Sequence, residues 1–192
     1  MKTKNISVGI AGIFLFAVAS LPQTVLADKV VEMDLRFAGA FISNSLPSPL
    51  IHVQAKGKPG KAVIRGYGGD PARDNVEAPV FECLGSPGVF VRITAAEDPL
   101  LFTFKDLSLL FADGTGVICV DLTSPTGDVM FRFDIMFTGG RGKYEGATGT
   151  AVITGEAQPI SANGTFLAET GTIVGTIIVP DDDDSDSDSD SD

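Results

Sequence analysis

The side chains of this chain that could do chemistry are few and scattered. His52 is the only histidine, and an imidazole could serve as a base near neutral pH. It has no second histidine with which to share a metal ion, and the chain contains no Gly-x-Ser-x-Gly segment that would supply a nucleophile. We therefore expect His52 to have no special role and predict neither a metal site nor a cofactor.

Carboxylates offer more candidates. Five of them lie in or beside strand-like segments: Glu82, Asp106, Asp121, Asp134 and Glu145. If Asp121 pointed into an apolar interior, desolvation would raise its pKa and make it a plausible acid or base. The plainer interpretation is surface charge, with Arg132 and Asp134 pairing with neighbours on adjacent strands. The sequence thus leaves the catalytic and the ligand-binding residues unassigned.

A glycine-spaced segment at 137–149 is the most informative feature of the chain. Its Gly140–Gly146 portion does not match a dinucleotide-binding loop, because the third glycine comes one residue late and no helix follows. Glycine reaches positive φ and lets backbones approach closely, so the spacing predicts a turn between two strands. The residues of this turn motif are Gly139, Gly140, Gly142, Tyr144, Gly146 and Gly149.

The elements around this turn are predicted to be strands. Apolar residues alternate with other residues over 129–137, which is the period of a strand with two different faces. Similar segments lie at 29–37, 51–55, 61–65, 88–94, 100–110, 116–122, 128–138, 148–154, 164–169 and 172–179. Residues 105–110 are the best helix candidate, and 66–79 are the expected mobile loop. Short strands with glycine-rich turns predict an all-β fold, a small antiparallel barrel or alternatively a β-sandwich.

The pattern Gly-Gly-x-Gly-x-aromatic-x-Gly-Ala-x-Gly at 139–149 resembles the strand-turn-strand signature of secreted, calycin-like β-barrels of the allene oxide cyclase and dirigent type. The resemblance is close over 128–155 and implies the barrel rather than the sandwich. Allene oxide cyclases bind a fatty-acid epoxide, and dirigent proteins steer the radical coupling of phenols. None of their pocket residues can be matched to a position in this chain.

The two ends of the chain differ in character from its middle. Lys2 and Lys4, a short apolar segment and small residues before Asp28 are typical of a signal peptide, residues 1–27, cleaved after Ala27. The mature protein would be secreted or periplasmic, without an integral membrane segment. Residues 28–180 form one expected domain, and 181–192 an acidic Asp/Ser tail that is predicted to be disordered. We do not expect nucleic acid as a partner, because phosphate binding needs a basic stripe.

Cys83 and Cys119 are the only cysteines. In an exported chain an even pair most simply forms a disulfide bond, and the alternative is two buried thiols. A disulfide closing a loop of this length would stabilise the fold by about 3–4 kcal/mol in the chain-entropy model.

Three functions are compatible with these features. The favoured one is a non-catalytic barrel that binds a small apolar ligand or a surface partner, because segments such as 117–122 are apolar on both faces, as in a barrel wall around an apolar lumen. The second is a cyclase- or isomerase-like enzyme for a lipid or phenolic substrate, using a pocket carboxylate or Tyr144. The third is a surface or matrix protein whose acidic tail gathers cations. The oligomeric state is left open.

Overall fold

The computed structural model describes residues 28–42, 50–67, 74–161 and 166–181, without the side chains of 96–98. The predicted signal peptide and nearly all of the predicted acidic tail lie outside the described residues. The elements are β1 (Lys29–Ile42), β2 (Leu50–Lys58), β3 (Lys61–Tyr67), β4 (Asn75–Cys83), β5 (Ser86–Phe104), β6 (Leu109–Asp121), β7 (Val129–Arg141), the short 3-10 helix η1 (Gly142–Tyr144), β8 (Thr148–Pro159) and β9 (Phe166–Val179). In the described part of the chain, no helix is long and apolar enough to cross a membrane.

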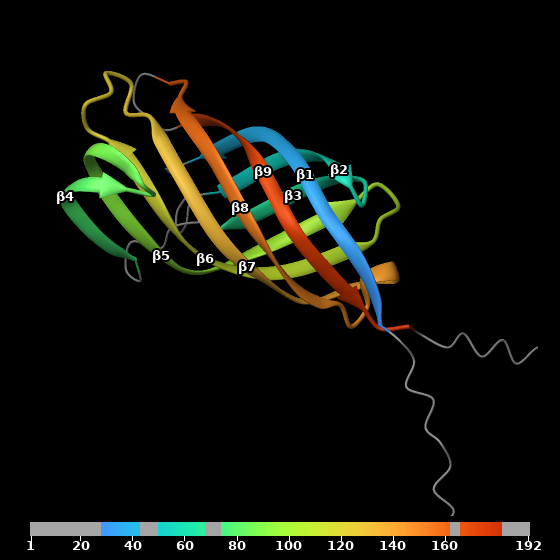
Figure 1. Ribbon diagram of the computed structural model, residues 1–192. Helices are drawn as coiled ribbons and strands as arrows, with labels where there is room; N and C mark the ends of the chain where they lie inside the picture. Colours follow the sequence, from blue (N-terminus) through green and yellow to red (C-terminus); the bar gives the residue numbers. More distant parts are fainter. Residues whose placement is uncertain (1–27, 43–49, 68–73, 162–165, 182–192) are drawn as a thin grey trace, which may run out of the picture.

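Eight of these strands close into an antiparallel barrel (Figure 1). The sheet order is β3-β2-β1-β9-β8-β7-β6-β5, and β5 returns to pair with β3. The closing seam runs from Ala62 opposite Phe104 to Gly66 opposite Leu100. The predicted barrel is therefore confirmed, and the sandwich alternative is wrong because a sandwich would leave sheet edges unpaired here.

Strand β4 lies outside this ring, against the first half of β5 (Figure 1). Strand β5 pairs with β4 through its first half and with β3 through its second half. Between the two halves its register with β6 shifts, at Ala95 to Asp98. A shift of this kind bends a strand and redirects its edge. Residues 75–79 were expected to belong to a loop, but they form the first part of β4. That expectation is therefore wrong for these residues. Most of β4 is exposed, and it therefore lacks the apolar alternation that identifies a strand in sequence.

Two other boundaries differ from the sequence prediction. The predicted strand 100–110 is interrupted by a turn in which the Leu107 amide donates to the Phe104 carbonyl, and the same turn replaces the helix candidate at 105–110. Leu107 has a positive φ of 66° there, which an α-helix does not allow. The described residues of the two predicted strands at 164–169 and 172–179 belong to the single strand β9, while 164 and 165 lie outside the described residues.

The main core lies inside the barrel, and a smaller one lies outside it. Among the fully buried side chains of the interior are Phe102, Leu35 and Leu110. The outer core contains Cys83, Phe90 and Cys119 between β4 and the barrel wall. Cys83 and Cys119 form the predicted disulfide, with a Cα–Cα distance of 6.0 Å, so β4 is tied to β6.

The glycine-spaced turn closes the end of the barrel where both ends of the described domain lie (Figure 1). Gly142 and Gly146 have φ values of 63° and 66°, in the left-handed region that favours glycine. Between them Tyr144 is 2% exposed, with its ring 4.7 Å from the Phe104 ring. The motif thus forms a turn, as predicted, and it plugs this end with an aromatic side chain.

Candidate ligand-binding cavity

The half of the barrel away from the plugged end contains a cavity of about 470 Å³. Its wall is almost entirely apolar. The lining residues are Phe37, Phe41, Ile51, Val53, Ile64, Asp74, Val76, Ile93, Leu100, Gly114, Ile118, Val120, Gly127, Val129, Phe131, Phe133, Ile153, Ala157, Pro159, Leu167, Glu169 and Ile173. A volume of this size lies within the range of pockets that hold small organic molecules.

Glycines at inward-facing positions explain why this half stays open. A Cβ added to Gly171 would lie 2.6 Å from the tip of the Phe37 ring, and one added to Gly155 would lie 2.5 Å from the tip of the Phe131 ring. Each ring therefore extends over a glycine of a neighbouring strand and lies against the wall. Large aromatic side chains line the lumen in this way without filling it.

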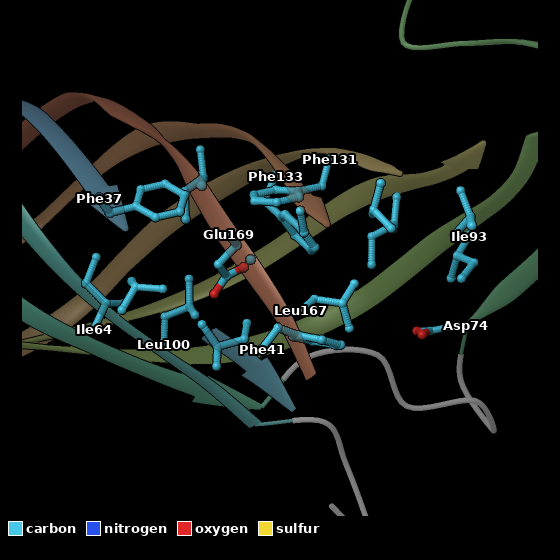
Figure 2. A pocket seen from close by; sticks show the side chains of 18 of the residues that line it. Phe37, Phe41, Ile64, Asp74, Ile93, Leu100, Phe131, Phe133, Leu167 and Glu169 are labelled. Atoms are coloured by element: carbon cyan, nitrogen blue, oxygen red, sulfur yellow. The ribbon is translucent and has the colours of Figure 1, made fainter. Parts of the chain in front are cut away.

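Glu169 brings a carboxyl group into this apolar wall. It occupies an inward position of β9, on the face that also carries the buried side chains of Leu167 and Ile173. Its partners across the sheet are Gly39 on β1 and Ala157 on β8, which are too small to cover it. Figure 2 shows the carboxyl group projecting among the apolar side chains of the cavity.

The environment of Glu169 offers this carboxyl group little compensation. The residue is only 6% exposed, and its Oε1 atom has no hydrogen-bond partner among the described residues. Burial disfavours the charged form, and it raises the pKa of Glu169 to about 7. Near neutral pH this carboxyl group therefore exchanges between its protonated and ionised forms.

Asp74 is the other acidic residue of the lining, and no lysine, arginine or histidine of the described residues contributes to it. Asp74 directly precedes β4 and is half-buried, and it lies apart from Glu169 in Figure 2. The ionisable side chains that the described residues bring to the cavity wall are therefore both acidic.

The carboxylates suggested by the sequence lie elsewhere. Asp121 accepts hydrogen bonds from the Thr123 hydroxyl and amide, each at 2.7 Å, and these bonds lower its pKa. The suggested desolvated acid at this position is therefore wrong. Asp134 forms an exposed ion pair at 3.3 Å with Arg132 of its own strand, where pairing with adjacent strands was expected.

The remaining candidates are also outside the cavity. The Asp106 carboxylate accepts a 2.6 Å hydrogen bond from Lys143, which lowers the pKa of Asp106. Glu82, Glu145 and His52 are exposed on the barrel exterior. Tyr144 does not line the cavity, since its ring is packed in the plugged end, so the suggestion that it serves a pocket is not supported.

Sequence reasoning missed Glu169, although a signal was present. Leu167, Glu169, Ile173 and Ile177 share the parity of one strand face. Residues 164–169 and 172–179 were predicted as two separate strands, so the alternation was not followed across residue 170 and Glu169 was not recognised as an inward-facing residue. Read as one strand, the segment places a single acid in an otherwise apolar row.

The pairings and the lumen define the protein as a small closed antiparallel β-barrel with an apolar cavity. No family model matches the chain, and no curated protein matches it in sequence. Among solved structures, the chain is similar to the pterocarpan synthase dirigent protein GePTS1, with 10% identity, coverage of 82% of this chain and 89% of that chain, and a TM-score of 0.26. An overlap at that TM-score carries no argument about function, and the barrel assignment rests on the strand pairings.

Proposed function

We propose that this chain is an exported binding protein that holds a small, mostly apolar molecule inside its barrel. The observation that carries the proposal is the cavity of about 470 Å³, whose wall consists almost entirely of aliphatic and aromatic side chains. The disulfide between Cys83 and Cys119 supports an oxidising compartment, where such bonds persist.

The closed barrel makes such a cavity a good receptor. Hydrogen bonds hold the strands that carry the lining residues around the whole ring, so the pocket is formed before a ligand enters. A preformed pocket spares the free-energy cost of ordering the wall on binding. Each square ångström of apolar ligand surface removed from water contributes about 25 cal/mol, and the wall offers few polar atoms to favour water instead.

Diphenylhexatriene, a hydrocarbon that fluoresces in apolar surroundings, provides the test. We expect the purified protein to bind it with a saturable rise in fluorescence. Ala157 is buried and lines the cavity, so Ala157→Phe places a ring in the lumen and should abolish the signal. Ala168 is exposed on the outer face of β9, which makes Ala168→Phe the matched control that retains binding.

Two results would contradict the proposal. One is the absence of saturable fluorescence with the unmodified protein. The other is equal binding by the Ala157→Phe and Ala168→Phe variants when circular dichroism shows both to be folded, because the probe would then sit outside the lumen.

A second candidate function follows from Glu169. A buried carboxyl group with a pKa of about 7 in an apolar cavity is suited to general acid–base catalysis, so the barrel could be a cyclase- or isomerase-like enzyme for a lipid or phenolic substrate. In that case Glu169→Gln should abolish turnover while diphenylhexatriene binding remains. A bound molecule that leaves the protein chemically unchanged would favour the binding protein.

A further inference from the structure

The charge and shape of the cavity restrict the chemical class of the ligand, given the proposed function of the lumen. We propose that the ligand is a lipophilic amine, whose ammonium group pairs with the Glu169 carboxylate while its hydrocarbon part occupies the apolar cavity. This deepens the proposed function, and it rests on that function for the location of the ligand.

The protein itself leaves the Glu169 carboxyl group without a full set of hydrogen-bond partners. Oε1 is buried without a hydrogen-bond donor, and the residues opposite Glu169 in the sheet, Gly39 and Ala157, carry no polar side-chain atom. A buried polar group without a partner costs free energy, and a buried carboxylate without a counter-charge costs more. A ligand that donates hydrogen bonds at this point removes that cost.

A second feature is the sign of the charge. Among the described residues, both ionisable side chains of the lining, Glu169 and Asp74, are acids. A ligand with a carboxylate or phosphate head group placed beside the ionised Glu169 would meet a like charge in a medium of low dielectric constant, where repulsion is strong. An ammonium group carries the opposite charge and has up to three N–H donors for the carboxylate oxygens.

A third feature is the aromatic composition of the wall near Glu169. On β1, Phe37 and Phe41 stand two positions to either side of Gly39, the residue opposite Glu169. Phe131 lies 6.4 Å from Phe37, measured between ring centroids, and all three rings line the cavity (Figure 2). Aromatic faces attract cations, more strongly where water is excluded. A carboxylate set among phenyl rings is therefore a receptor for an organic cation.

Competition among ligands of equal chain length tests this inference. Decylamine, decanol and decanoate should each be titrated at pH 8 against bound diphenylhexatriene. We expect decylamine to be the tightest competitor and decanoate the weakest, although the uncharged alcohol leaves water more readily than the ammonium. The dissociation constant of decanol divided by that of decylamine measures the preference for the amine. In Glu169→Gln this ratio should fall by about ten- to hundredfold, which is the effect of losing a hydrogen bond to a charged group.

Glu156→Gln is the matched control, because Glu156 is exposed on the outer face of β8, and it should leave this ratio unchanged. A second readout is pH. At pH 5.5 the Glu169 carboxyl group holds its proton, so decylamine should bind more weakly than at pH 8 while decanol binding is unchanged. Asp74 is the other acidic residue that the described part of the chain contributes to the lining, and comparing the parent with Glu169→Gln at both pH values isolates the contribution of Glu169.

The outcomes distinguish this inference from the proposed function. If the probe binds and decanol competes as well as decylamine, or if Glu169→Gln leaves the ratio unchanged, the amine inference is overturned and the apolar binding function stands. If the probe does not bind at all, both are overturned.

Discussion

Glu169 makes the stability of this protein depend on pH in a direction opposite to that of most carboxylates. Its pKa rises from an ordinary value of 4.5 to about 7 in the folded state, so the folded state binds the proton more tightly than the unfolded chain. The full stability is then present below pH 4.5 and is lost as the pH rises toward 7. A tenfold difference in proton affinity corresponds to about 1.4 kcal/mol. The ionised carboxylate should therefore lower the free energy of unfolding by about 3 kcal/mol at pH 8.

Glu169→Gln removes this effect, because the amide imitates the protonated carboxyl group and does not titrate. Urea unfolding followed by circular dichroism should show similar stabilities for the two proteins at pH 4.5 and a more stable variant at pH 8. Taking the difference between variant and parent at each pH cancels the opposite contributions of Asp106 and Asp121, whose pKa values are lowered.

Glu156→Gln, on the exposed face of β8, is the control and should show no pH-dependent difference from the parent. A Glu169→Gln difference that is the same at both pH values would refute the reasoning. So would a parent protein that gains stability relative to Glu169→Gln as the pH rises, since either result means that Glu169 is solvated or paired with a cation.

Three further predictions concern the fold. Replacing Cys83 and Cys119 by serine should lower the free energy of unfolding by about 3–4 kcal/mol. The variant should still bind diphenylhexatriene, because the disulfide ties β4 to the outside of the barrel. Loss of binding in a folded variant would contradict this prediction. Phe102→Ala should lower the free energy of unfolding in urea by about 3–5 kcal/mol, and Phe133→Ala should lower it less. The reason is that Phe102 is 0% exposed, whereas Phe133 borders the cavity. Equal losses of stability would argue against an open lumen. Gly149→Ala should lower the free energy of unfolding by about 1–3 kcal/mol, which would be measured as a lower melting temperature. The φ of Gly149 is +123°, and the new Cβ would lie 2.2 Å from a carbonyl oxygen of β9. An unchanged melting temperature would show that this contact is relaxed.

Much of the barrel was predictable from local patterns. Alternation over 129–137 reflects one strand face that is buried and another that is solvated, and β7 is found at Val129–Arg141. Four glycines of the turn motif, Gly139, Gly142, Gly146 and Gly149, have positive φ, which glycine adopts readily, so the turn between β7 and β8 required no knowledge of distant residues. The disulfide was also predictable, because the chain has only two cysteines.

The missed features depend on distant partners. Strand β4 is an additional edge strand whose partner is the first half of β5, and its exposed residues give no alternation. The break at 105–108 depends on a turn in which Leu107 takes a positive φ, a conformation that leucine does not signal in sequence. Tyr144 resembled a candidate pocket residue until the packing placed its ring against Phe104 in the plugged end.

By itself, the sequence determined that the chain forms strands with apolar faces and where its principal glycine turn lies, because these properties arise from neighbouring residues. With two cysteines in the chain it also allowed a single intramolecular pairing, and the tertiary structure showed that this bond forms. Only the tertiary structure decided which half of the barrel is filled and which is hollow. That outcome depends on contacts across the sheet, in which Phe37 of β1 extends over Gly171 of β9 and Phe131 of β7 extends over Gly155 of β8. Closure of the barrel also buries the carboxyl group of Glu169. Its desolvation, which raises its pKa, is produced by strands that come from the whole length of the domain.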